Sequence, residues 1–195
     1  MRTKIIMKEL AELLKIKEEP IPQSNNALNW KLSKNGRPSF GGVYVFWWRG
    51  TLDQFLSTIQ NPEFHFRGPG GVQLTLKIDK GHLNIAPNDR LPLYVGKNAS
   101  DFAKRIGLNL KLGTARTVDR ALVNGIAKRM TTSCQVRDRL DRLFPNYEDT
   151  RTIATENLAI SYKQIDGKDN FVERFYLEDL AIGILKPIFN VDSER

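Results

Sequence analysis

The stretches Gly42-Val43-Tyr44-Val45-Phe46-Trp47-Trp48 and Leu91-Pro92-Leu93-Tyr94-Val95-Gly96-Lys97 decide the fold of this chain. The first is rich in β-branched and aromatic residues, which pack well on a half-buried pleated surface, so residues 43–48 predict a strand. Residues 91–95 predict a second strand, and Gly96 then permits a turn. Tyr44 and Tyr94 therefore lie on strands, where a tyrosine is most often simply packed in the core.

Further helices and strands follow from the spacing of apolar residues and from turn signals. In chain order, the predicted elements are a helix at 4–17, a short helix at 52–59, a strand at 72–78, a turn into 82–85, a helix at 101–112 with Ser100 as N-cap, helices at 118–130 and 133–144, a strand at 158–165, and a helix at 171–185 that Pro187 closes. This mixture predicts an α+β fold.

Length and composition indicate one globular unit. A chain of 195 residues, 41% hydrophobic and 27% charged, is expected to form a single elaborated domain. We divide it into an N-terminal helix and linker (1–22), an insertion (51–90) and a basic helical hairpin (114–145). The sequence has no apolar run of membrane-spanning length, and early charges argue against an export signal. The lone cysteine, Cys134, cannot form an internal disulfide, so we expect a cytoplasmic protein.

Positive charge is concentrated in one segment. The net charge is +8, and residues 97–142 hold eleven basic and four acidic residues, a surplus of seven. Most charge runs are solvated surfaces, but this one adjoins Tyr94 and Lys97, so we favour a nucleic-acid partner. The residues predicted to contact phosphates are Arg116, Arg120, Lys128 and Arg129.

The helices at 118–130 and 133–144 are spaced like a helix-turn-helix. On the second helix, Gln135, Arg139 and Arg142 would then face outward, and glutamine and arginine read adenine and guanine edges in the major groove. The alternative is an ordinary helical hairpin with a basic, solvated face.

Three separated blocks together resemble the GIY-YIG nuclease family. They are Gly42-Val43-Tyr44, then Tyr94-Val95-Gly96-Lys97 with Arg105 on the next helix, then Glu178 about three turns before Pro187-Ile188-Phe189-Asn190. Each block alone is weak evidence for the family, whereas the order of the three blocks along the chain is more specific evidence. The resemblance implies a small central antiparallel sheet flanked by helices, here with a β-rich insertion and an added helical hairpin.

The resemblance also implies metal-dependent cleavage of phosphodiester bonds. Glu178 is then the ligand of Mg²⁺, for which Mn²⁺ can substitute, and Arg105 holds the scissile phosphate. Lys97 holds a phosphate or lowers the pKa of a tyrosine, Tyr44 or Tyr94 orients or deprotonates the attacking water with Tyr44 favoured, and Asn190 supports the site by hydrogen bonding. Many members have His or Tyr where this chain has Asn109, which leaves a histidine base in doubt.

The same residues have plainer interpretations. Glu178 shares a helix face with Phe171, Phe175 and Ile182, where a glutamate at the edge of the core in a salt bridge would be expected. Arg105 could be an exposed helix arginine and Lys97 a loop lysine. The family resemblance favours the catalytic interpretation over these.

A core without a separate DNA-binding domain resembles the type II restriction branch of the family, many members of which act as dimers. We therefore expect a sequence-specific endonuclease of double-stranded DNA that could form a homodimer. Two alternatives stay open: a structure-selective repair or mobile-element nuclease, and a DNA-binding module that has lost catalysis.

Overall fold

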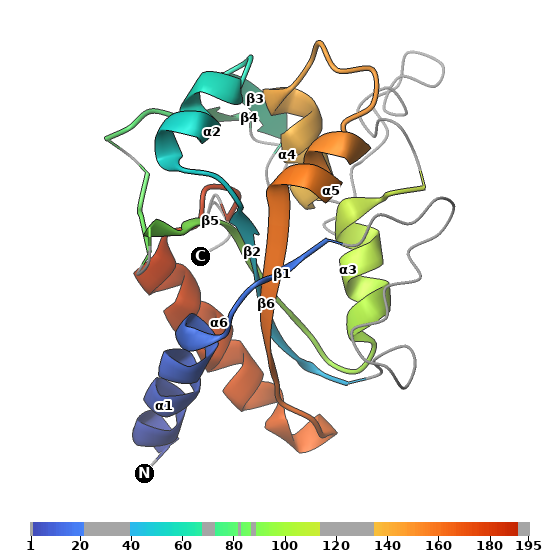
Figure 1. Ribbon diagram of the computed structural model, residues 1–195. Coiled ribbons are helices and arrows are strands. Elements are labelled where there is room, and N and C mark those ends of the chain that lie inside the picture. Colours follow the sequence, from blue (N-terminus) through green and yellow to red (C-terminus); the bar gives the residue numbers. More distant parts are fainter. Residues whose placement is uncertain are drawn as a thin grey trace.

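A four-stranded sheet with helices on both faces forms the centre of the computed structural model (Figure 1). The structure describes residues 2–21, 40–67, 73–81, 83–86, 89–113 and 135–190. Its elements are α1 (Arg2–Lys15), β1 (Glu19–Pro20), β2 (Gly42–Trp48), α2 (Leu52–Thr58), β3 (Glu63–Arg67), β4 (Gln73–Lys77), β5 (Leu91–Asn98), α3 (Phe102–Leu110), α4 (Gln135–Leu143), α5 (Arg151–Asn157), β6 (Leu158–Gln164), the 3₁₀ turn η5 (Lys168–Asn170) and α6 (Phe171–Leu185). The predicted α+β fold is confirmed.

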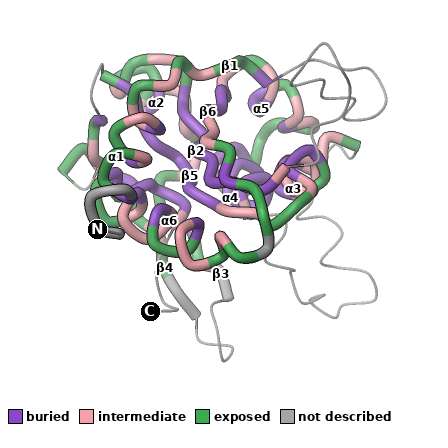
Figure 2. Tube along the Cα trace, turned by 90° about the horizontal axis from the view of Figure 1, so that it is seen from below, coloured by how far each residue is buried: buried purple, intermediate pink, exposed green. Residues whose placement is uncertain are grey.

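The sheet has the strand order β1-β6-β2-β5, and every pair in it is antiparallel. β2 is central and buried along its whole length, which explains its run of apolar and aromatic residues. Seen from below, β2, β5 and β6 form the mainly buried centre of the molecule, whereas β1 is exposed (Figure 2). β5 lies at the edge of this sheet, a position that matters for the candidate site.

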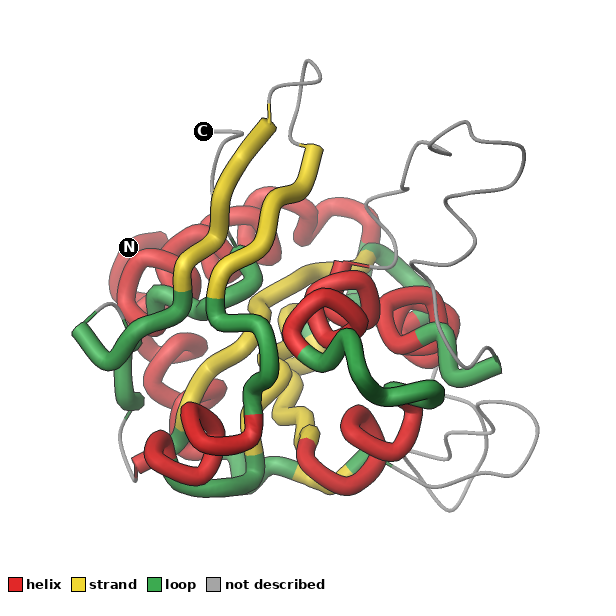
Figure 3. Tube along the Cα trace, turned by 90° about the horizontal axis from the view of Figure 1, so that it is seen from above, coloured by secondary structure: helices red, strands yellow, loops and turns green. Residues whose placement is uncertain are grey.

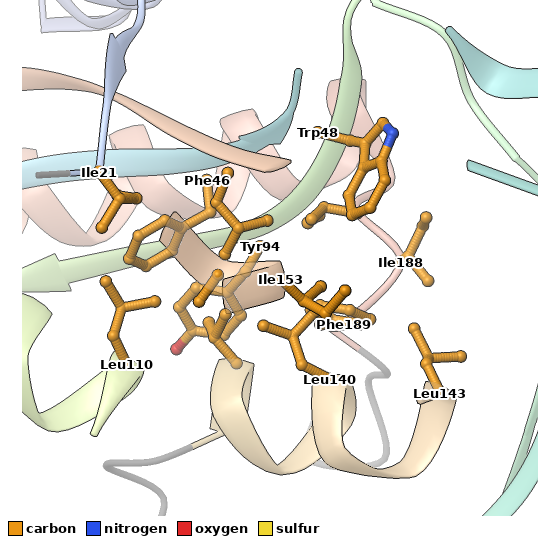
Figure 4. Packing of buried hydrophobic residues seen from close by; sticks show 14 of the residues in the cluster. Ile21, Phe46, Trp48, Tyr94, Leu110, Leu140, Leu143, Ile153, Ile188 and Phe189 are labelled. Carbon is orange, nitrogen blue, oxygen red and sulfur yellow. The ribbon is translucent and has the colours of Figure 1, made fainter. Parts of the chain in front are cut away.

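Alternation along β2 divides the core into two layers. Val43, Val45 and Trp47 point to the side covered by α1 and α6. Tyr44, Phe46 and Trp48 point to the opposite side, where α3, α4 and α5 contribute apolar side chains. Figure 4 shows part of this second layer, with Phe46, Tyr94 and Leu140 packed between the sheet and the helices.

The insertion carries a second, two-stranded sheet. β3 and β4 form an antiparallel hairpin in which Phe64 lies opposite Leu76 and His65 opposite Thr75. The hairpin projects from the body of the molecule (Figure 3). No helix in the described part of the chain has both the length and the apolar character needed to cross a membrane.

Several predicted boundaries were wrong. α3 begins after Asp101, whose side chain accepts a hydrogen bond from the backbone N–H of Lys104 at 2.9 Å, so Asp101 and not Ser100 is the N-cap. β1, β3 and α5 had not been predicted, because they are short and take their stability from tertiary partners. The helix predicted at 118–130 lies outside the described residues.

A buried ionic network joins α4 to its neighbours. Arg137 has no exposed surface. Its Nε donates to Thr150 Oγ1 at 2.7 Å and lies 3.3 Å from Asp141 Oδ1, and its Nη1 donates to the carbonyl of Leu110 at 3.3 Å. The carbonyl of Leu110 belongs to the last turn of α3, so Arg137 fixes that helix end against α4.

Replacing Arg137 by methionine should destabilise the fold by about 3–5 kcal/mol, because the buried Asp141 would keep its charge without this partner. The measurement is the free energy of unfolding from urea titration. Arg151→Met is the matched control, since the Arg151–Asp149 pair is partly exposed, and it should cost less than about 1 kcal/mol. Equal losses in the two variants would contradict a structural role for the buried network.

Candidate active site

The candidate site contains a close contact between two neighbouring strands. Tyr44 on β2 lies directly opposite Gly96 on β5. A Cβ atom on Gly96 would lie 2.5 Å from the Tyr44 hydroxyl oxygen, so a larger residue cannot occupy this position without moving the ring. Gly42 is restricted in the same way, because its Cβ would lie 2.2 Å from the carbonyl oxygen of Lys163 on β6. The two glycines of the predicted motifs are therefore steric requirements of the sheet.

The hydroxyl of Tyr44 is held by two donors from α3. Asn109 Nδ2 donates to it at 2.7 Å and Arg105 Nε at 3.3 Å. Tyr44 is completely buried, and this burial raises the pKa of its phenol well above the usual value, with Tyr94 adding to the increase and Arg105 opposing it. Tyr44 is therefore a neutral phenol near pH 7. Asn109 stands where many GIY-YIG nucleases have His or Tyr. In this chain its side chain donates a hydrogen bond to Tyr44.

Tyr94 lies beside Tyr44 on the same face of the sheet. Their ring centroids are 6.3 Å apart. Burial raises the pKa of Tyr94, the positive charge of Arg105 opposes that increase, and the negative charge of Glu178 adds to it. The charge of Arg105, which hydrogen-bonds Tyr44, thus also acts on Tyr94.

Lys97 and Glu178 lie on the other side of β5. Because successive residues of a strand point to opposite faces, Lys97 turns toward α6 while Gly96 faces α3. The Lys97 ammonium forms an ion pair with Glu178 Oε2 and lies 5.1 Å from the centroid of the Phe175 ring. The exposed fraction is 38% for the Lys97 side chain and 16% for that of Glu178, so both are reachable from solvent. Since β5 is an edge strand of this sheet, the two groups of residues meet around that edge.

Asn190 closes the edge of β5 through its amide. Its Oδ1 accepts from the backbone N–H of Val95 at 2.7 Å, and its Nδ2 donates to the Val95 carbonyl at 2.9 Å. Beside it, the backbone N–H of Phe189 donates to the carbonyl of Leu93 at 2.7 Å. The side chain of Asn190 therefore pairs with β5 as a neighbouring strand would, one residue before Gly96.

Two of the three apolar residues that share a face with Glu178 are not part of the core, whereas Ile182 is partly buried against it. Phe171 and Phe175 are 65% and 52% exposed, and Arg174, Leu177, Ala181 and Leu185 form the buried side of α6. The predicted salt bridge of Glu178 exists, with Lys97 as its partner. Glu178 thus lies at the border between the buried and the exposed sides of its helix.

The second helix of the predicted hairpin, now α4, was expected to face outward and read bases. This prediction of its orientation was wrong. Seven of the nine residues of α4 are buried, among them Arg139, which is 7% exposed. Arg142 is half-buried and binds Asp138 and the carbonyl of His65, while Gln135 at the start of the helix is partly exposed. Charged residues had suggested a solvated face, but here they pair with one another inside the protein. Arg116, Arg120, Lys128 and Arg129 lie outside the described residues, and their phosphate contacts stay a prediction.

Comparison of the chain with protein-family models, with curated proteins and with solved structures found no match. The geometry of the site is independent of these comparisons. That geometry brings together Tyr44, Tyr94, Arg105 and Asn109 on one side of β5, and Lys97 and Glu178 on the other. The buried ion pairs of Asp138 with Arg139 and Arg142 were not predicted. Only the close spacing of these three residues could have indicated an ionic cluster.

Gly96→Ala should cost about 1–3 kcal/mol of stability, because its methyl group overlaps the Tyr44 ring and must push it from Arg105 and Asn109. Chemical denaturation measures this loss. Gly183→Ala is the matched control: a Cβ there meets nothing within 4 Å, and alanine in the helix should stabilise by about 0.5–1 kcal/mol. If Gly96→Ala were as stable as the wild type, the contact with Tyr44 would not be a constraint.

Proposed function

We propose that this chain is a Mg²⁺-dependent endonuclease of the GIY-YIG type, which hydrolyses phosphodiester bonds of double-stranded DNA. The observation that carries the proposal is the hydrogen bond from Arg105 to Tyr44, with Tyr94 beside them on one side of β5, while Lys97 and Glu178 pair on the other. An arginine, a lysine, a carboxylate and two phenols form a set that can bind a phosphate and orient a water. The order of the motifs in the sequence supports the same activity.

The accessibility of these side chains suggests separate roles. Tyr44 and Tyr94 are 0% and 5% exposed, whereas Lys97 and Arg105 are partly open to solvent. We therefore assign the first contact with the substrate phosphate to Arg105 and Lys97, whose charges would offset the negative charge that develops on its oxygens. The tyrosines hold Arg105 in place and, with substrate bound, orient the attacking water. Asn190 maintains the shape of β5 beneath them.

Glu178 is the residue that would hold a metal ion. Its carboxylate supplies hard oxygen ligands and is partly exposed, which suits Mg²⁺ because this ion keeps several waters and needs few protein ligands. Within the described ranges, no three His, Cys, Asp or Glu side chains form a cluster that could hold a metal ion. When bound, Mg²⁺ would neutralise charge on the phosphate and the leaving group. Lys97 must then release the Glu178 oxygen and can turn to the phosphate.

The charge distribution supports DNA as the substrate. Most of the net charge lies in residues 97–142, the segment that also contributes Lys97 and Arg105 to the site. A sequence-specific restriction enzyme of the cytoplasm, acting as a homodimer, is the form that the family resemblance favours. Two alternative functions compete with this one: a repair or mobile-element nuclease, and a DNA-binding module that has lost catalysis.

The deciding experiment incubates the purified protein with a long, sequence-diverse duplex, in Mg²⁺ and in EDTA. Discrete fragments that need Mg²⁺ are expected, and their ends would give the recognition site. Diffuse or branch-dependent cleavage would favour a structure-selective nuclease over a restriction enzyme. A salt-sensitive gel shift without cleavage would indicate a DNA-binding module without nuclease activity.

Glu178→Gln should abolish cleavage and leave DNA binding measurable, because it removes the metal-binding charge but not the basic segment. Glu173→Gln, on the same helix and away from Lys97, is the matched control and should cleave normally. The readouts are fragment yield and gel-shift affinity with the same duplex. Undiminished cleavage by Glu178→Gln would remove this residue from the site.

Arg129→Glu should weaken DNA binding and reduce the slope of log affinity against log salt, because fewer counterions are released on binding. Lys8→Glu changes the net charge equally on α1, where Lys8 is exposed, and should have a smaller effect. Fluorescence anisotropy with a labelled duplex at several salt concentrations measures both. Identical slopes for the two variants would mean that the 114–145 segment is not the DNA-binding face.

A further inference from the structure

The ammonium group of Lys97 has two partners on one turn of α6, the helix that packs along β5 (Figure 1). It forms an ion pair with Glu178 Oε2, and it lies over the ring of Phe175, 5.1 Å from the ring centroid. Residues three positions apart on a helix are neighbours on its surface, so Phe175 and Glu178 form one contact surface for the ammonium. One partner is a carboxylate, and the other is the negatively polarised face of an aromatic ring.

Packing in the core does not explain Phe175. The residue is 52% exposed, whereas the buried residues of α6 lie on another side of the helix. A half-exposed ring keeps much of its apolar surface in water and gains correspondingly little free energy from burial. Its ring contacts the Lys97 ammonium and, edge to face, the ring of Tyr176, which is itself 50% exposed. A role outside the core therefore fits this ring better.

The two partners of Lys97 respond differently to a bound cation. Glu178 is the carboxylate that would hold a divalent cation, and the charge of that cation repels an ammonium on the same carboxylate. The face of the Phe175 ring offers no ligand oxygen to a hard cation, so it stays available to the ammonium. Without a second partner, the flexible and strongly hydrated lysine side chain would spread over many conformations in solvent.

We propose that Phe175 is a positioning residue of the candidate site: its ring face keeps the Lys97 ammonium at the edge of β5 when Glu178 no longer pairs with it. Lys97 then stays where it can meet a phosphate oxygen while the carboxylate holds a cation. The consequence for cleavage rests on the proposed function. The retention of Lys97 on the ring does not.

The strength of such a contact sets the size of the expected effect. A cation–π contact at a partly exposed site favours the bound arrangement by a factor of about 2–5. When the ion pair is removed, about two thirds to five sixths of the molecules should therefore keep the ammonium on the ring.

The test uses NMR of the full chain labelled with carbon-13 lysine. Protons above an aromatic ring are shifted upfield by its ring current, so the ε-methylene signal of Lys97 should lie upfield of those of exposed lysines such as Lys8 and Lys80. Its loss in Lys97→Arg identifies the signal. An ordinary position of the Lys97 signal in the wild type would overturn the proposal.

Glu178→Ala separates the ring from the ion pair, because it removes the carboxylate and leaves no oxygen acceptor in its place. More than half of the upfield shift of Lys97 should remain in this variant. The shift should disappear when Phe175→Leu is added. If Glu178→Ala alone moved the signal to the position of an exposed lysine, the ion pair would be what holds Lys97, and the proposal would fail.

Two further variants distinguish the ring face from a general change in α6. Phe175→Trp keeps an aromatic face and should preserve the upfield shift. Phe171→Leu is the matched control, because Phe171 lies one turn earlier on the same helix and is 65% exposed, and it should leave the Lys97 signal unchanged. An equal loss of the shift in Phe171→Leu and Phe175→Leu would contradict a specific contact.

Cleavage kinetics supply the functional arm. Phe175→Leu should lower kcat/KM about 2- to 5-fold, whereas Phe175→Trp and Phe171→Leu should remain near the wild type. An unchanged kcat/KM in a Phe175→Leu variant that has lost the upfield shift would show that Phe175 does not position Lys97 for the reaction. If the wild type cleaved no DNA, the proposed function would fail, whereas the NMR comparison would still decide whether the ring retains Lys97.

Discussion

The missing side chain at Gly96 is the constraint on which the site depends. Only hydrogen at this position leaves room for the Tyr44 ring, whose hydroxyl would lie 2.5 Å from a Cβ atom. With the ring in this place, its oxygen lies within hydrogen-bonding distance of Arg105 and Asn109 on α3. The orientation of Arg105 therefore follows from a steric condition in the sheet. Buried polar groups need such partners, which is why the helix and the strand fix each other.

The position of β5 at the edge of the sheet explains how residues on opposite faces can form one site. Lys97 and Glu178 approach from the α6 side, and Tyr94 and Arg105 from the α3 side. If β5 were a central strand, the neighbouring strands on both sides would separate these two groups of residues. Asn190 occupies the free hydrogen-bonding positions of Val95, so the edge is stabilised without a further strand that would block access.

Charge in this protein serves two different purposes, and composition does not distinguish them. Arg137, Asp138, Arg139 and Asp141 form ion pairs that have little or no contact with solvent. Arg137 connects α4 with α3 and with the start of α5, and Arg142 connects α4 with the β3–β4 hairpin. The basic surplus of the segment therefore overstates the charge available to a DNA backbone. A count of arginines cannot show which of them find a carboxylate inside the fold.

The sequence by itself determined the main elements: β2 and β5 from their apolar composition, α6 from its length and the proline after it, and the residues that assemble around Tyr44 and Tyr94. These features are local, or they follow the order of motifs on which the proposed resemblance is based. Only the tertiary structure decided that Asn109 binds Tyr44, that Phe171 and Phe175 are exposed, and that Arg139 points inward. It also decided the short elements β1, β3 and α5. The physical reason is that burial and ion pairing depend on segments far apart in the chain, whose approach no local pattern encodes.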